Sequence, residues 1–145
     1  MNIRKAKKKD ANRIAEIEIF NYRLNFYPIF KNDEFYFDEL QVSKLINEIN
    51  KSIESYYVYD DGVIKGFMQI DNIQLKKLFV EPVLQNNGIG SELLKFANVN
   101  FNVNYLWALE KNIKAIKFYL SNGFRATDEK IFEEGTSEYL VKLVK

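Results

Sequence analysis

The sequence predicts an α/β fold of the α+β kind: a single domain with a mixed, mostly antiparallel sheet of about seven strands and helices on both faces. The 145 residues suffice for one well-buried core and are few for two. Strand-like and helix-like runs follow the order β-α-α-β-β-β-α-β-α-β-β, without repeats or low-complexity segments. A helix-like run joins the fourth and fifth strands, which should therefore be parallel, as in a βαβ crossover.

The N-terminal third should hold one short strand followed by two helices, over residues 3–6, 10–25 and 40–53. Asp10 is the expected N-cap of the first helix, because apolar residues follow it at helical spacing. Pro28 should break this helix. Residues 26–38, rich in Tyr and Phe, are expected to form a loop or a broken helix.

The remaining elements alternate more regularly. Strands are expected over 55–59, 63–70, 72–80, 105–109, 124–132 and 139–143, and helices over 88–98 and 112–121. Asp60-Asp61-Gly62 predicts a hairpin turn in which the glycine supplies a positive φ. Asn122-Gly123 predicts a helix C-cap.

Composition excludes several kinds of chemistry. The net charge of +1 gives no electrostatic reason to expect a nucleic-acid partner. The chain has no Cys and no His, which excludes thiolate nucleophiles, disulfides, Ser-His-Asp catalysis and metal sites built on either residue. The chemistry must then use carboxylates, tyrosine, lysine, backbone groups or water, and no metal is expected.

No apolar run is long enough to span a bilayer, and no apolar segment follows the basic N-terminus. A signal peptide is therefore not expected, no membrane partner is expected, and the cytoplasm is the predicted location.

Residues 78–94 carry the clearest functional signal. A strand-like run ends before Pro82, Gly88 and Gly90 follow, and a helix-like Ser-Glu-Leu-Leu comes next. Glycines at a helix start let backbone N–H groups approach a ligand, and the helix dipole favours negative charge there. This arrangement predicts a seat for a phosphate or pyrophosphate.

The neighbouring residues exclude two kinds of phosphate loop. No Lys-Ser or Lys-Thr follows Gly90, so the nucleoside triphosphate loop does not fit. Leu93 stands where a dinucleotide loop has its third glycine. Gln85-x-x-Gly88-x-Gly90 resembles the acetyl-CoA pyrophosphate loop of the GNAT N-acetyltransferase superfamily. The resemblance implies that this region binds the cofactor through Leu78, Phe79, Val80, Gln85, Asn86, Asn87, Gly88, Ile89, Gly90 and Ser91.

A second motif supports the resemblance. In residues 109–124 an Asn opens a helix, Ala-Ile lies inside it, Phe-Tyr follows, and Gly-Phe starts the next strand, as in the later GNAT signature. Asn112 and Tyr119 lie seven residues apart, so both should project from one helix face. The resemblance implies that Asn112 contacts the pantetheine arm or pyrophosphate and that Tyr119 points its hydroxyl at the sulfur of CoA.

The resemblance also implies a mechanism. A free backbone N–H near Phe79 or Val80 polarises the thioester carbonyl, and Tyr119 acts as general acid to the leaving thiolate. Without a cysteine to accept the acetyl group, direct transfer is favoured over an acyl-enzyme. Taken alone, Asn112 is equally well explained as a helix cap, and a half-buried core tyrosine is the alternative for Tyr119.

The general base is left open. Strand alternation places Gln74 on the same face as Lys76, Leu78 and Val80, where some relatives carry a catalytic Glu, and an amide cannot accept the proton. Trp107, on the neighbouring strand, is expected to form a wall facing the substrate. A water chain would serve without a dedicated base, and the carboxylates that remain as candidates acting through water are Glu81, Asp71 and Glu110.

The resemblance implies that the two N-terminal helices and the loop over residues 27–38, which lies over the acceptor side of the cleft in such folds, determine the substrate. Five aromatic and two acidic residues there are suited to a cationic amine: Tyr22, Tyr27, Phe30, Phe35, Tyr36, Asp33 and Glu34. Packing of the same rings onto the sheet is the alternative.

The sequence thus predicts one N-acetyltransferase domain over residues 1–145, a monomer or homodimer that moves acetyl from acetyl-CoA to a primary amine of a small molecule or peptide. The alternative is a catalytically weak acyl-CoA-binding regulatory module of the same fold.

Overall fold

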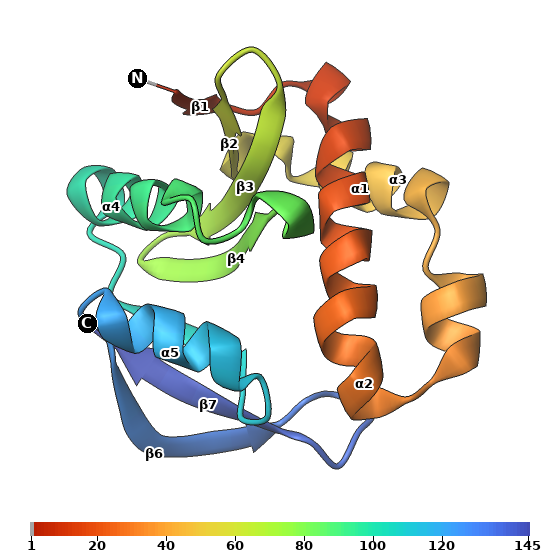
Figure 1. Ribbon diagram of the computed structural model, residues 1–145, viewed down its shortest axis with the longest axis vertical. Coiled ribbons are helices and arrows are strands. Elements are labelled where there is room, and N and C mark those ends of the chain that lie inside the picture. Colours follow the sequence, from red (N-terminus) through yellow and green to blue (C-terminus); the bar gives the residue numbers. More distant parts are fainter. Residues whose placement is uncertain (1) are drawn as a thin grey trace.

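A computed structural model describes residues 2–145 and contains one mixed sheet (Figure 1). Its strands are β1 (Ile3–Lys5), β2 (Tyr56–Asp60), β3 (Ile64–Asp71), β4 (Gln74–Val80), β5 (Tyr105–Leu109), β6 (Arg125–Phe132) and β7 (Tyr139–Val144). They lie in the order β1-β2-β3-β4-β5-β7-β6, and all neighbours are antiparallel except β4 and β5. The predicted mixed sheet and its parallel crossover pair are confirmed.

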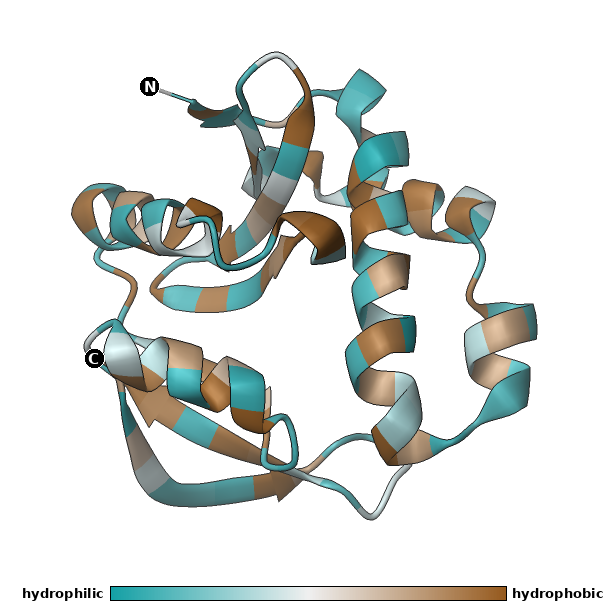
Figure 2. Cartoon of the chain, in the orientation of Figure 1, coloured by the Kyte–Doolittle hydropathy of each residue, from teal (hydrophilic) through white to brown (hydrophobic). Residues whose placement is uncertain are grey.

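Helices cover both faces of the sheet. They are α1 (Ala11–Asn21), α2 (Tyr27–Phe30), α3 (Val42–Lys51), α4 (Ile89–Phe101) and α5 (Ile113–Ser121). α1 and α3 pack on one face, around the buried Ile14, Ile49 and Phe67, and α4 and α5 lie on the other, around Met68 and Leu93. Brown and teal bands alternate along α1 and α4 in Figure 2, as expected for helices that bury one side. None of the helices in residues 2–145 is long and apolar enough to cross a membrane.

The two parallel strands diverge soon after they pair. Gln74 of β4 lies opposite Tyr105 of β5, which is the one paired position between these strands in the described residues. β4 continues to Val80 along an edge that no strand covers. The backbone groups of this edge therefore have no partner strand and bind side chains or a ligand instead.

A bulge interrupts β4 at Lys76. Gln69 of β3 lies opposite Lys77, whereas Ile70 lies opposite Leu75, so Lys76 is one residue more than the ladder needs. Side chains before the bulge therefore change faces relative to those after it.

The bulge makes the prediction for Gln74 wrong. Strict alternation places Gln74 with Leu78 and Val80, but the extra residue moves it to the face of Lys77. Lys77 is on the α1 side, because its ammonium pairs with Glu18 of that helix (3.1 Å). Gln74 therefore faces the α1 layer.

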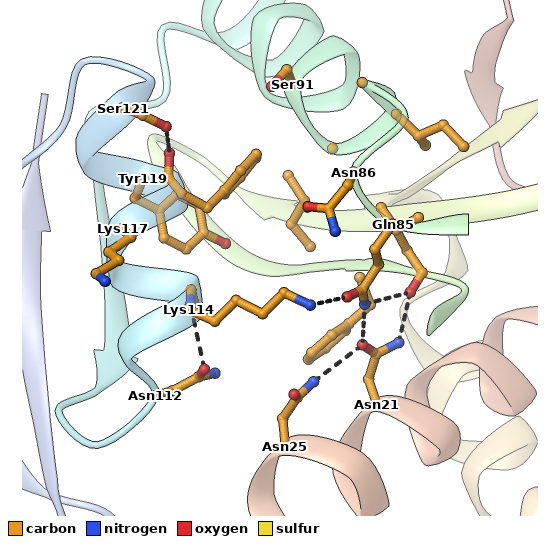
Figure 3. Close-up of a pocket in the computed structure, with 18 of the residues that line it drawn as sticks. Asn21, Asn25, Gln85, Asn86, Ser91, Asn112, Lys114, Lys117, Tyr119 and Ser121 are labelled. Carbon is orange, nitrogen blue, oxygen red and sulfur yellow. Dashed lines mark hydrogen bonds between the residues drawn. The ribbon is translucent and has the colours of Figure 1, made fainter. Parts of the chain in front are cut away.

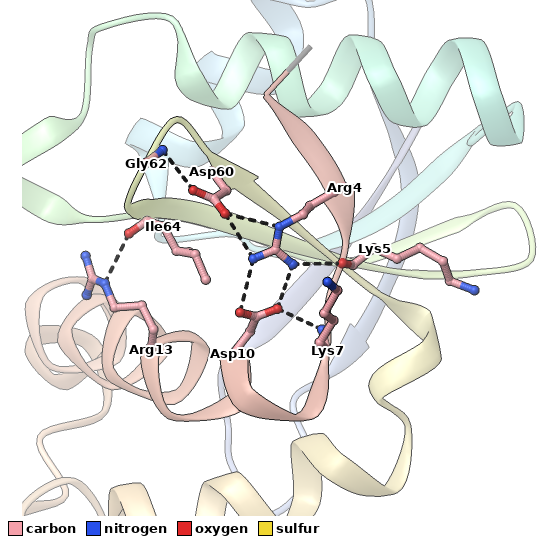
Figure 4. Close-up of polar contacts among 8 residues, drawn as sticks. All are labelled: Arg4, Lys5, Lys7, Asp10, Arg13, Asp60, Gly62 and Ile64. Carbon is pink, nitrogen blue, oxygen red and sulfur yellow. Dashed lines mark hydrogen bonds and ion pairs between the residues drawn. The ribbon is translucent and has the colours of Figure 1, made fainter.

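Asp10 does not cap α1 as predicted, because its side chain makes no capping hydrogen bond to that helix. Its carboxylate accepts instead from the Lys7 N–H (2.7 Å) and from the Arg4 guanidinium (2.8 and 3.1 Å), and Arg4 also donates to Asp60 (Figure 4). Burial alone would raise the pKa of Asp10, but these hydrogen bonds and the Arg4 charge hold it below its ordinary value. The cluster ties β1 to the start of α1 and to the β2–β3 turn.

The first helix continues past Pro28, where the sequence predicts a break. A π-helical turn over Tyr22–Phe26 follows α1, and the N–H of Tyr27 reaches the carbonyl of Tyr22. Pro28 then lies in the first turn of α2, where a missing N–H leaves no helical bond unmade. A second π-helical turn covers Phe35–Glu39. Of the two forms predicted for residues 26–38, the broken helix is confirmed.

Candidate functional site

The glycine-containing loop connects β4 to α4 as predicted. After Val80 a 3₁₀ turn spans Pro82–Leu84, and α4 begins at Ile89 with Gly88 as its N-cap. Gly88 has φ +85°, and a Cβ there would meet no atom within 4 Å. The glycine is therefore required by its left-handed backbone and not by crowding within the protein.

A cavity of about 650 Å³ lies between this loop and α5 (Figure 3). Most of the predicted cofactor-binding residues line it: Leu78, Phe79, Val80, Gln85, Asn86, Gly88, Ile89, Gly90, Ser91, Asn112 and Tyr119. We call it the donor cavity. Asn87 is outside its lining, because its amide turns back to the carbonyls of Leu84 (3.1 Å) and Gln85 (3.3 Å).

Gln85 spans the mouth of the donor cavity. Its amide N–H group donates to Asn21 Oδ1 (3.1 Å) and to the Val80 carbonyl (3.2 Å), and its Oε1 accepts from Lys114 Nζ (2.7 Å). Figure 3 shows Lys114 reaching from α5 across to this amide. The side chain predicted to bind cofactor therefore already links α1, β4 and α5.

Asn21 is a site residue that the sequence reasoning missed. It is buried in α1, where its Nδ2 donates to the carbonyls of Ile17 (2.9 Å) and Val80 (3.0 Å) while its Oδ1 accepts from Gln85. These bonds satisfy the buried amide and fix the end of β4. A lone Asn within the apolar stripe of a helix is the signal that could have identified it.

Gly90 lies in a tightly packed position. A Cβ at this position would lie 3.2 Å from the ring of Phe118, which projects from α5. The missing side chain lets that ring pack against the first turn of α4.

The edge of β4 offers a free backbone donor. The N–H of Glu81 donates to the carbonyl of Lys65 in β3 (2.9 Å), and successive N–H groups along a strand point in opposite directions. The N–H groups of Leu78 and Val80 therefore point away from β3, toward the uncovered edge, whereas that of Phe79 points to β3. Of the two predicted carbonyl donors, the register favours Val80.

Asn112 and Tyr119 both line the donor cavity, as predicted from their spacing. The Asn112 Oδ1 accepts from the Ala115 N–H (3.4 Å), so Asn112 also caps α5. Tyr119 is 9% exposed, and its hydroxyl has no hydrogen-bond partner among residues 2–145 although it is not sealed from solvent. Burial raises the pKa of Tyr119, so the phenol keeps its proton at neutral pH.

A second cavity of about 700 Å³ lies between β4, β5 and the π-helical segments, and we call it the acceptor cavity. Aromatic side chains form much of its wall: Tyr22, Phe26, Phe30, Phe35, Tyr36, Phe79 and Trp107. Leu78, Phe79, Asn112, Ala115 and Tyr119 line both cavities. The two cavities therefore meet at these five residues, and Tyr119 is one of them.

The carboxylates predicted as candidate bases do not meet there. Glu81 and Glu110 are each paired with a basic side chain (3.4 and 2.5 Å), and Asp71 is exposed at the end of β3. None of the three is among the described residues that line either cavity. Gln74 and Trp107 do line the acceptor cavity, and Trp107 forms part of its wall as predicted.

The acidic residues of the acceptor cavity differ from those predicted. Asp33 and Glu34 lie outside its lining, and Asp33 accepts a hydrogen bond from the hydroxyl of Tyr27, which is also outside. Glu133 and Glu134 of the β6–β7 turn line the cavity instead. Their distance in sequence from the aromatic segment explains why local pattern reasoning missed them.

A buried ion pair closes the α1 side of the acceptor cavity. Lys77 lines it, and its Nζ lies 3.1 Å from both oxygens of the fully buried Glu18 carboxylate. Burial lowers the pKa of Lys77, but the Glu18 charge outweighs this and holds it above the ordinary value. Lys77 is therefore a cation that is already compensated within the protein.

The sheet splits at two parallel strands, a helix led by a glycine lies beside the split, and two cavities join there, so the site has room for two ligands side by side. Comparison with known proteins identifies the family. The acetyltransferase (GNAT) domain family matches residues 18–140, and the chain belongs to this family.

Solved structures share the whole fold. YjaB of Escherichia coli has a TM-score of 0.75 and 19% identity, covering 98% of this chain and 95% of that chain. The PaiA N-acetyltransferase of Thermoplasma acidophilum, solved with coenzyme A, has a TM-score of 0.71 and 22% identity, covering 97% of this chain and 96% of that chain. YncA of Salmonella typhimurium, solved with its cofactor acetyl-CoA, has a TM-score of 0.63 and 17% identity, covering 99% of this chain and 91% of that chain. At these identities the likeness concerns the fold.

Proposed function

We propose that this chain is an acetyl-CoA-dependent N-acetyltransferase that moves the acetyl group directly to a primary amine of a small molecule or peptide. The observation that carries the proposal is the position of Tyr119, which lines both the donor and the acceptor cavity and whose hydroxyl has no hydrogen-bond partner in the described residues. We propose one such domain over residues 1–145, working in the cytoplasm, which a chain without cysteine suits.

The donor cavity suits a CoA thioester. The first turn of α4 supplies backbone N–H groups and the positive end of a helix dipole, which favour a pyrophosphate. Lys114 and Lys117 add positive charge on the opposite wall. These residues complement a long anionic ligand whose thioester end reaches the cavity junction.

The residues at the junction account for the bonds made and broken. A neutral amine nitrogen attacks the thioester carbonyl carbon, and the Val80 N–H stabilises the oxyanion that develops. When the carbon–sulfur bond breaks, Tyr119 donates its proton to the leaving sulfur. The amine loses a proton to water, and the Tyr119 phenolate regains a proton from water. Direct transfer follows because the chain has no cysteine to hold the acetyl group.

Steady-state kinetics on the purified chain tests this proposal. Release of free thiol from acetyl-CoA is measured against a panel of aliphatic amines, aminoglycosides and peptide N-termini. Turnover with at least one class, and initial-velocity lines that intersect as expected for a ternary complex, are the expected results. Binding of acetyl-CoA without thiol release from any amine would favour the regulatory module, and parallel lines would refute direct transfer.

A further inference from the structure

Glu133 carries an uncompensated negative charge in the acceptor cavity. It is half-buried in the turn between β6 and β7. No Lys or Arg side chain of residues 2–145 forms an ion pair with its carboxylate. Lys77, a cation in the same lining, is held by Glu18. A partly desolvated carboxylate without a cation favours a ligand that brings one.

The surroundings of Glu133 also suit a cation. Tyr36 lines the same cavity as Glu133. Burial raises the pKa of Tyr36, and the negative charge of Glu133 raises it further. Phe26, Phe30 and Phe35 line the same cavity. Aromatic faces attract an ammonium group through their quadrupole, so the rings and the carboxylate act in the same direction.

Glu133 is not among the residues that line both cavities. It lines only the acceptor cavity, whereas the residues that line both cavities lie on β4 and on α5 with its N-cap. A carboxylate beside the reacting nitrogen would hold it as an ammonium, which cannot attack a carbonyl. Glu133 is therefore suited to a cationic group other than the reacting amine.

We propose that Glu133 binds a second ammonium group of the acceptor, so that the substrate is a small aliphatic diamine or polyamine. The inference rests on the proposed N-acetyltransferase function. A cavity of about 700 Å³ is within the range that small molecules occupy. Glu133 acts here as a specificity-determining residue and takes no part in bond making.

The test compares α,ω-diaminoalkanes with n-alkylamines of equal chain length. Turnover is measured with acetyl-CoA, and direct binding to the CoA-loaded protein is measured by calorimetry. The wild-type chain, Glu133→Gln and Glu129→Gln are assayed together. Glu129→Gln is the matched control, because it makes the same charge change at an exposed position of β6 outside both cavities.

The wild-type chain should prefer the diamine at one or more chain lengths by about tenfold in kcat/KM, which corresponds to about 1.4 kcal/mol. Glu133→Gln should abolish this preference by raising the KM for the diamine, while kcat and the kcat/KM for the monoamine stay within about twofold. Glu129→Gln should change neither the preference nor the turnover. Equal turnover of both amines at every length, or an equal loss for both in Glu133→Gln, would overturn the inference but leave the N-acetyltransferase proposal standing.

Absence of turnover with any amine would count against the proposed function. In that case calorimetry still decides the role of Glu133. Diamine binding that is weakened about tenfold by Glu133→Gln supports it, and binding that is unchanged or undetectable refutes it.

Discussion

Replacing Tyr119 by Phe separates chemistry from packing, because the hydroxyl has no protein partner. The ring packs against Phe118 and Phe124, with centroids 5.1 and 5.9 Å away, and Phe keeps both contacts. No hydrogen bond between the hydroxyl and residues 2–145 is lost. The free energy of unfolding should therefore change by less than about 0.5 kcal/mol, below the value of one hydrogen bond.

The effect on turnover should be large. A positioned general acid contributes at least about 10²-fold, so kcat should fall by that factor, or by about 2.7 kcal/mol in activation free energy. Burial raises the pKa of Tyr119, and the same environment raises the pKa of the leaving thiol, so proton transfer between them does not become uphill through burial alone. The affinity for acetyl-CoA should stay within about twofold.

Melting temperature, acetyl-CoA affinity and kcat are measured on one preparation of Tyr119→Phe. Tyr105→Phe is the matched control, because its hydroxyl donates to Gln74 (3.3 Å) and it lies outside the lining of both cavities. The control should lose about 1 kcal/mol of stability and keep its kcat. An undiminished kcat in Tyr119→Phe at saturating substrates would remove the hydroxyl from the mechanism.

Two further predictions concern the cofactor loop and the N-terminal ion cluster. Gly90→Val should weaken acetyl-CoA binding by more than tenfold in calorimetry, because its side chain presses against Phe118 and narrows the donor cavity. Gly88→Asn should bind acetyl-CoA within a fewfold of wild type, because Asn tolerates the positive φ of Gly88. An affinity of Gly90→Val equal to that of wild type would disprove the assignment of the loop. Asp10→Asn should lower the unfolding free energy by about 2 kcal/mol at pH 7. Since the folded pKa of Asp10 lies below 3.8, this difference should persist above that pH and vanish as pH falls through the folded pKa, and urea titrations showing a pH-independent difference would contradict the ion pair.

The order of elements was predictable because it depends on local signals. Apolar spacing identified the helices, and Gly62 and Gly123, both with positive φ, marked a turn and a helix end. The crossover from β4 to β5 then required a parallel pair, which the structure confirms. Each of these inferences uses residues that are neighbours in sequence.

The failures depend on partners distant in sequence or on irregular backbone. Asp10 has a good N-cap side chain, but Arg4 and the Lys7 N–H bind its carboxylate first. The bulge at Lys76 is set by pairing with β3, and no glycine marks it. The acidic side of the acceptor cavity comes from Glu133, about a hundred residues after the rings that surround it.

The position of the carboxylates bears on the missing general base. The residues shared by the two cavities include no Asp or Glu in the described chain, so the amine of the proposed transfer would meet apolar atoms, an amide and a phenol there. Such surroundings lower the pKa of an amine, because burial disfavours its charged form. They therefore favour the neutral nucleophile, and water can remove the remaining proton without a dedicated base. A carboxylate at the junction would oppose this effect, whereas Glu133, which lines only the acceptor cavity, is proposed to hold a second ammonium group.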